Sequence, residues 1–105
     1  MEDFLQQGIV QARQGDYKSA IATFDQAITA NRECPEAYYH RGLAYSELAE
    51  TERAIADYNQ SLKLDTQQIN VYLSRATAFL ALDQVQSCII DLQIIFSLDP
   101  NCDRA

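Results

Sequence analysis

The chain has 105 residues, of which 48% are hydrophobic and 22% charged, and this composition argues against an intrinsically disordered protein. Its formal net charge of -7 and its pI near 4.4 disfavour nucleic acid and anionic membranes as partners, because both carry negative charge. The opening MEDFLQQG lacks the features of a signal peptide, and no apolar run is long enough for a membrane span. We therefore expect one soluble, cytoplasmic domain with a protein partner.

The first predicted helix covers residues 3–14, where apolar residues recur at the three- and four-residue spacing of a helix face. Gly15 then allows the chain to leave the helix in a left-handed conformation, and Asp16 can accept hydrogen bonds from the free amides of the next helix. The second predicted helix covers residues 17–30. A turn this short requires the two helices to pack antiparallel.

The second unit repeats this scheme with predicted helices at 36–48 and 51–64. Pro35 is suited to the first turn of a helix, where its missing amide hydrogen costs nothing. Ala49 and Glu50 replace the Gly-Asp turn of the first unit. We therefore expect this corner of the chain to be less constrained.

The third unit has predicted helices at 69–82 and 84–98, with Asp83 as the expected cap and Pro100 as the stop. Its last helix has more apolar residues than one buried stripe requires. Ile95 stands at a position that is small in the first two units, so we expect it to prevent a further identical unit from docking without rearrangement.

The surplus apolar residues Ile90, Ile94 and Phe96 have three interpretations. They form the seat of a missing capping helix, a contact between copies of the chain, or a site for another partner. We favour self-association or a missing cap, because an exposed helix with a second apolar face seldom stays uncovered in solution.

One pattern recurs every thirty-four residues along the chain. A small residue stands at Gly8, Gly42 and Ala76, and an aromatic residue precedes each of them by four positions. In the same register a second small residue is followed four positions later by a bulky one, in the pairs Ala20 and Phe24, Ala54 and Tyr58, and Cys88 and Leu92. The chain therefore contains three copies of one helix-turn-helix unit.

This pattern resembles the tetratricopeptide repeat, and the match covers nearly the whole chain. The main departures are Gln7, Arg41 and Arg75, where leucine is usual. The resemblance divides a single domain, 1–105, into repeats at about 1–34, 35–68 and 69–102. It implies an all-α solenoid of six antiparallel helices in a right-handed superhelix, whose first helices line a concave groove.

Such repeats are protein-interaction modules without catalytic chemistry or cofactors, so the resemblance implies a scaffold or adaptor that holds a peptide or helix of a partner protein. The partner-binding groove expected from it comprises Leu5, Ile9, Arg13, Tyr39, His40, Leu43, Glu47, Leu73 and Thr77. Its apolar members stand where packing between helices does not require them, and its polar members would tune selectivity. The alternative function is a structural oligomerisation module that acts through the last helix.

Family members that hold the carboxylates of heat-shock chaperones use lysine, asparagine and arginine side chains. The matching positions here are Leu5, Ile9, His40, Asn70 and Ser74. Because no cation remains, we do not expect a two-carboxylate clamp. His40 has no metal-ligand partner at a suitable spacing, and Cys34 and Cys102 are too far apart to bridge, so we expect no metal site, disulfide or enzyme activity.

Overall fold

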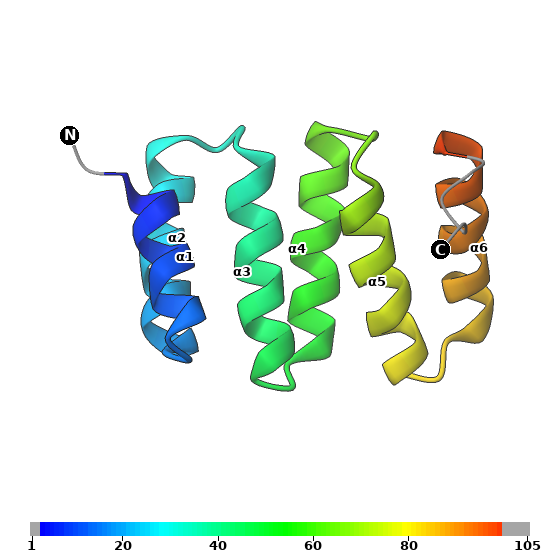
Figure 1. The fold of residues 1–105 in the computed structure, drawn as a ribbon, viewed down its shortest axis with the longest axis horizontal. Helices are drawn as coiled ribbons and strands as arrows, with labels where there is room; N and C mark the ends of the chain where they lie inside the picture. Colours follow the sequence, from blue (N-terminus) through cyan, green and yellow to red (C-terminus); the bar gives the residue numbers. More distant parts are fainter. Residues whose placement is uncertain (1–2, 100–105) are drawn as a thin grey trace.

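The computed structural model describes residues 3–99, which form six α-helices and no strand (Figure 1). The helices are α1 (Phe4–Arg13), α2 (Tyr17–Ala30), α3 (Pro35–Glu47), α4 (Thr51–Leu64), α5 (Ile69–Ala81) and α6 (Val85–Leu98). All six begin and end within one residue of the predicted positions, and Pro35 opens α3 as expected. The predicted all-α solenoid of helix pairs is therefore confirmed.

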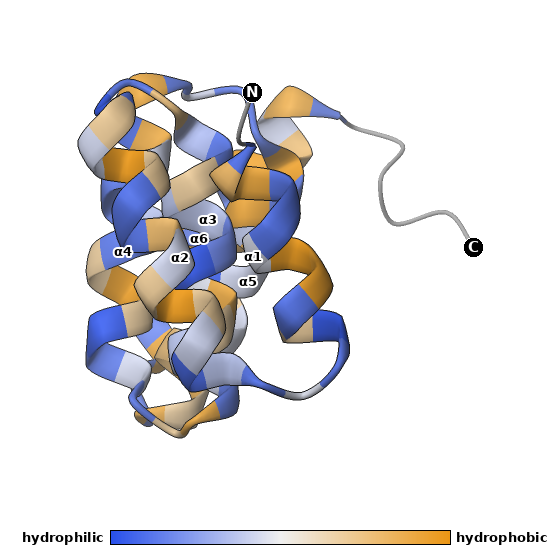
Figure 2. Ribbon diagram, turned by 90° about the vertical axis from the view of Figure 1, so that its left-hand side faces the viewer, coloured by the Kyte–Doolittle hydropathy of each residue, from blue (hydrophilic) through white to orange (hydrophobic). Residues whose placement is uncertain are grey.

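Three antiparallel pairs stack side by side, so that the body measures 40 × 25 × 25 Å (Figure 1). Helix α1 contacts α3, and α3 contacts α5, whereas α2, α4 and α6 contact only the helices next to them in sequence. The closer approach of α1, α3 and α5 places these helices on the inner side of the stack. Figure 2 views the stack from its α1–α2 end. Within the described range, no helix is both long and apolar enough to cross a membrane.

Each of the first two pairs is held by an aromatic ring that lies against a glycine. A Cβ atom on Gly8 would lie 2.4 Å from Cε1 of Phe24, and one on Gly42 would lie 2.7 Å from Cε1 of Tyr58. Both rings are completely buried. The absence of a side chain at the glycine thus lets the two backbones approach closely enough for the ring to fill the space between them.

The three turns within the pairs share one backbone conformation. Gly15 has φ +81°, and Ala49 and Asp83 both have φ +62°. The expectation that the corner at Ala49 is less constrained is therefore wrong, because the packing of the helix pair imposes the left-handed conformation on alanine as well. Asp83 is not the helix cap that we expected; it takes the place of Gly15, and the cap position belongs to Gln84, whose side chain makes no capping hydrogen bond. Asp16 caps α2 as predicted, by accepting from the amide of Ser19.

We predict that Ala49→Gly stabilises the domain. A left-handed residue with a Cβ costs about 1–2 kcal/mol, and the greater freedom of glycine in the unfolded chain offsets part of the relief, so the expected gain is about 0.5–1 kcal/mol. Urea unfolding of both proteins measures it. Gly15→Ala is the matched control and is expected to change stability in the opposite direction; a loss of stability in Ala49→Gly would contradict the explanation.

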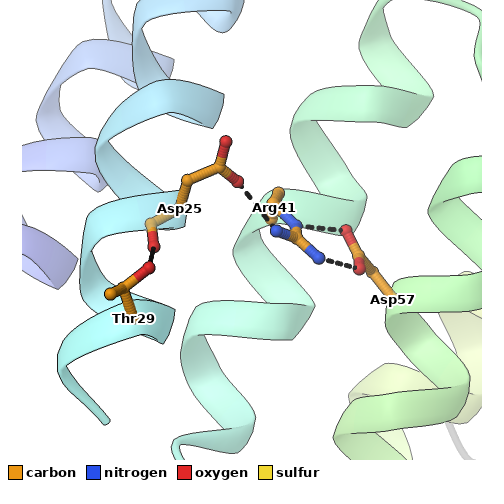
Figure 3. A network of polar contacts seen from close by, with 4 residues as sticks. All are labelled: Asp25, Thr29, Arg41 and Asp57. Atoms are coloured by element: carbon orange, nitrogen blue, oxygen red, sulfur yellow. Dashed lines mark hydrogen bonds and ion pairs between the residues drawn. The ribbon is translucent and has the colours of Figure 1, made fainter. Parts of the chain in front are cut away.

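An arginine on α3 connects the first pair of helices to the second (Figure 3). Arg41 donates from Nε and Nη2 to the two carboxylate oxygens of Asp57 at 2.8 and 2.7 Å, and from Nη1 to Asp25 at 2.7 Å. The hydrogen bonds to Asp57, followed by those to Asp25, raise the pKa of Arg41 further above its ordinary value. Arg41 therefore joins helix α4 of its own pair to α2 of the preceding pair.

The same contact recurs one repeat later. Arg75 donates to both oxygens of Asp91 at 2.9 and 2.6 Å and to the side-chain oxygen of Asn59 at 2.8 Å. In the first repeat, Gln7 and Thr23 stand at the arginine and aspartate positions. The arginines that depart from the family pattern are thus the donors of a repeated contact between helix pairs.

We predict that Asp57→Ala lowers the free energy of unfolding by about 2–4 kcal/mol, because it leaves the half-buried Arg41 without its bidentate partner. The side chain of Asp57 is 6% exposed and that of Asp25 is 54% exposed. Asp25→Ala is therefore the matched control, with an expected loss below about 1 kcal/mol. Chemical denaturation of both variants measures the difference, and equal losses would show that the bidentate contact does not dominate.

Candidate partner-binding groove

A cleft of about 300 Å³ lies between α1 and α3, close to the start of α2. It is lined by Ile9, Ala12, Arg13, Tyr17, His40, Leu43, Ala44 and Glu47. Five of the nine residues predicted for the groove therefore share this cleft. Ile9 and Leu43 supply bulky apolar surface, and Arg13 and Glu47 supply opposite charges.

The other four predicted groove residues lie elsewhere. Leu5 lines a second cleft of about 240 Å³ between α1 and the end of α2. The hydroxyl of Tyr39 lies 3.4 Å from Oγ of Ser74, at the contact between α3 and α5. Leu73 and Thr77 are exposed on α5. The predicted residues are thus divided between two clefts, a helix contact and open surface.

Two of the apolar groove residues also contribute to the folded core, contrary to expectation. Tyr39 and Leu43 are half-buried and pack against the core cluster that contains Tyr58 and Leu62. The reason is the contact between successive inner helices, which makes α3 share its inner side chains with its neighbours. The expectation that packing does not require these two residues is therefore wrong.

Tyr17 lines the cleft although the sequence did not predict it as a groove residue. The prediction assigned the groove to the first helix of each unit, and Tyr17 begins the second. The short turn at Gly15 places the start of α2 beside the end of α1. That turn was visible in the sequence and could have indicated that Tyr17 lies beside the groove.

The two charged residues of the cleft are available to a partner. Arg13 and Glu47 are exposed, near the ends of α1 and α3, and neither forms an ion pair with another residue in 3–99. An apolar cleft with one free cation and one free anion at its margin suits a peptide that carries an apolar side chain and charges of both signs.

Burial in this cleft favours the neutral form of the His40 ring. Burial lowers its pKa, an effect that Arg13 reinforces and Glu36 opposes. The ring stacks with Phe24 at 6.0 Å and meets Tyr39 edge to face at 5.2 Å, measured between centroids. A neutral histidine does not supply the cation that a carboxylate clamp needs. No group of three potential metal ligands occurs in the described part of the chain.

The family match agrees with this geometry. The tetratricopeptide repeat family matches residues 5–69, which is more than half of the sequence. The chain belongs to the tetratricopeptide repeat family. Proteins of this family are generally non-catalytic and interact with other proteins. No curated protein matches the chain significantly by sequence.

Several solved structures superpose closely on the chain. The first tetratricopeptide repeat domain of Spaghetti (RPAP3), bound to the HSP90 peptide SRMEEVD, has 25% identity and a TM-score of 0.90, with 95% of this chain and 79% of that chain covered. The Arabidopsis OM64 domain has 22% identity and a TM-score of 0.88, with 95% and 83% covered. The Yersinia enterocolitica chaperone SycD, in complex with a peptide of YopD, has 15% identity and a TM-score of 0.89, with 95% and 76% covered.

We predict that the domain loses stability as the pH falls from 7.5 to 5.5. The folded state holds His40 below its ordinary pKa, so the unfolded state binds the proton first as the pH drops through the unfolded value. The contribution of His40 is complete above that value and declines below it. Thermal unfolding over this range measures the loss. His40→Gln is expected to flatten the profile, and an unchanged slope in that variant would assign the effect to other groups.

Proposed function

We propose that this tetratricopeptide repeat domain is a scaffold or adaptor that binds a peptide or helix of another protein on its inner side. The observation that supports this most directly is the α1–α3 cleft, where Ile9 and Leu43 meet the unpaired Arg13 and Glu47. Leu73 and Thr77 are exposed on α5, and we propose that they extend the binding surface beyond the cleft. The free thiols of Cys34 and Cys88 suit a reducing compartment, which supports a cytoplasmic site of action.

The proposed ligand differs from the peptide that the RPAP3 domain binds. That peptide, SRMEEVD, ends in Glu-Glu-Val-Asp, with three acidic residues among its last four. In this chain the clamp positions are occupied by Leu5, Ile9, His40, Asn70 and Ser74, and burial lowers the pKa of the histidine. We therefore propose an internal segment with an apolar side chain for the cleft, an acidic residue near Arg13 and a basic residue near Glu47.

The energy available from such a contact is moderate. Complete burial of an exposed leucine or isoleucine side chain is worth about 1.5–3 kcal/mol, and Ile9 and Leu43 are already half-buried. Contacts to these two residues must therefore be supplemented by those to Leu73 and by the charges at the margin. This distribution favours a ligand that extends across more than one repeat.

We predict that Arg13→Glu weakens capture of the partner by about tenfold or more, because it reverses the charge that selects the ligand. Affinity capture from source lysate, with wild-type and variant chains side by side, identifies what only the wild type retains. Arg53→Glu is the matched control, because Arg53 is 68% exposed and lies outside the cleft.

Charge reversal is a cleaner test than Leu43→Lys, because Leu43 also packs against the core. Glu47→Lys provides an independent change in the same cleft, and Leu73→Lys tests the extension on α5. If Arg13→Glu, Glu47→Lys and Leu73→Lys all retain the same proteins as the wild type, the inner side is not the binding surface and the proposal is wrong.

A further inference from the structure

Large exposed apolar side chains are concentrated in the last helix pair. Seven of the nine that occur in residues 3–99 belong to α5 and α6. Five of these lie on α6: Val85, Ile89, Ile90, Leu92 and Phe96. Such a concentration at one end of a small acidic domain indicates a contact surface.

Four of these residues form one stripe along α6. Val85, Ile89, Leu92 and Phe96 are separated by four, three and four positions, which places them on one face over about three turns, and they are 41–49% exposed. We call this set the α6 stripe. Ile90 is exposed but falls outside the stripe at 3.6 residues per turn.

Two other apolar residues of α6 pack toward the core, which corrects two expectations. Ile94 is half-buried against the core cluster, so it does not belong to an exposed self-association face with Ile90 and Phe96. Ile95 is buried in the same cluster and does not project toward a further repeat. The α6 stripe is therefore a second apolar face, separate from the one that holds the helix in place.

The repeats show what kind of element covers such a stripe. Tyr58 and Leu62 on α4, equivalent to Leu92 and Phe96, share a core cluster with Val71 and Tyr72 of α5 and are at most 5% exposed. The α6 stripe is thus a surface built to pack against a helix, and no described helix covers it.

The first helix of a second copy does not match this stripe. On α3 and α5 the residues equivalent to Val10 are Ala44 and Ala78, which are buried, whereas Val10 is exposed. Its neighbours toward that end of the stack, Asp3, Gln7 and Gln14, are polar. A head-to-tail contact would therefore place polar groups against an apolar stripe, which is unfavourable.

Two copies of α6 do match each other when they run antiparallel. Val85 of one copy then lies opposite Phe96 of the other, which pairs a small side chain with a large one. At the centre, Ile89 lies opposite Leu92, and these two side chains are similar in size. The opposed helix dipoles favour this orientation. The contact is self-complementary, as a two-fold interface requires.

The charge distribution permits this contact despite the net charge of -7. The only ionisable carboxylate on α6 is that of Asp91, which is 1% exposed and paired with Arg75. The residues around the stripe, Gln86, Gln93 and Ser97, are uncharged. Just beyond the helix ends, Asp83 of one copy would lie near Asp99 of the other, so salt should strengthen the contact by screening these two carboxylates.

We propose that the α6 stripe joins two copies of this chain across a two-fold axis, with the α6 helices antiparallel. This contact is independent of the proposed groove, because none of its residues lines the α1–α3 cleft. Two joined domains would present two clefts to one partner or to two.

Sedimentation equilibrium of the full chain tests the proposal. At tens of micromolar we expect the wild type to show twice the mass of the 11.9 kDa chain. Leu92→Glu and Phe96→Glu are each expected to weaken association at least tenfold, and circular dichroism verifies that both stay helical. Val10→Glu and Leu73→Glu are matched controls at exposed apolar sites and should keep the mass of two chains. A monomeric wild type, or stripe variants that retain the doubled mass, would overturn the proposal.

Disulfide trapping tests the orientation of the two helices. In a background with the three native cysteines changed to serine, chains carrying Ile89→Cys are mixed with chains carrying Leu92→Cys. An antiparallel pair gives mainly the mixed disulfide. Predominant homodimeric disulfides would instead show parallel helices and overturn the proposed register.

Discussion

In each of the first two helix pairs, a ring from the second helix occupies the space that a Cβ atom on the first would need. Phe24 lies on Gly8 and Tyr58 lies on Gly42 in this way. Phe24 also stacks with His40 of the next pair, and Tyr58 shares a core cluster with Val71 and Tyr72 of the pair after it. The close approach within one pair therefore sets the position of the following pair, and with it the cleft between α1 and α3.

Electrostatic contacts between the pairs act in the same direction and also shape the surface. Arg41 and Arg75 each bind a buried carboxylate of their own pair, Asp57 or Asp91, and a polar side chain of the preceding pair, Asp25 or Asn59. Because Asp91 is used in this way, α6 presents no exposed charge, while the first two repeats carry most of the acidic surface. One end of the stack is thus apolar and neutral, and the inner side near α1 is apolar with charged margins.

The sequence predicted the helices well because Gly15, Asp16 and Pro35 mark helix ends by local chemistry. It did not predict the arginine contacts, although an aspartate follows each arginine by the same sixteen residues in both repeats. Five of the nine groove residues predicted from the sequence line one cleft. The prediction for Tyr39 was wrong because its burial depends on packing between the inner helices, which is a tertiary effect. On α6, where nearly every side is apolar, periodicity could not identify the face toward the core, so Ile94 and Ile95 were misplaced.

Each helix pair contacts only the pair next to it, so the domain behaves as a one-dimensional series of interfaces. Local opening is then graded along the chain, with the middle pair supported on both sides and the end helices on one. A ligand that spans α1 and α3 stabilises the interface between the first two pairs without touching the last. Ligand binding at the first two pairs can therefore affect the stability of the last pair only through the interfaces between the pairs. The middle pair transmits that coupling.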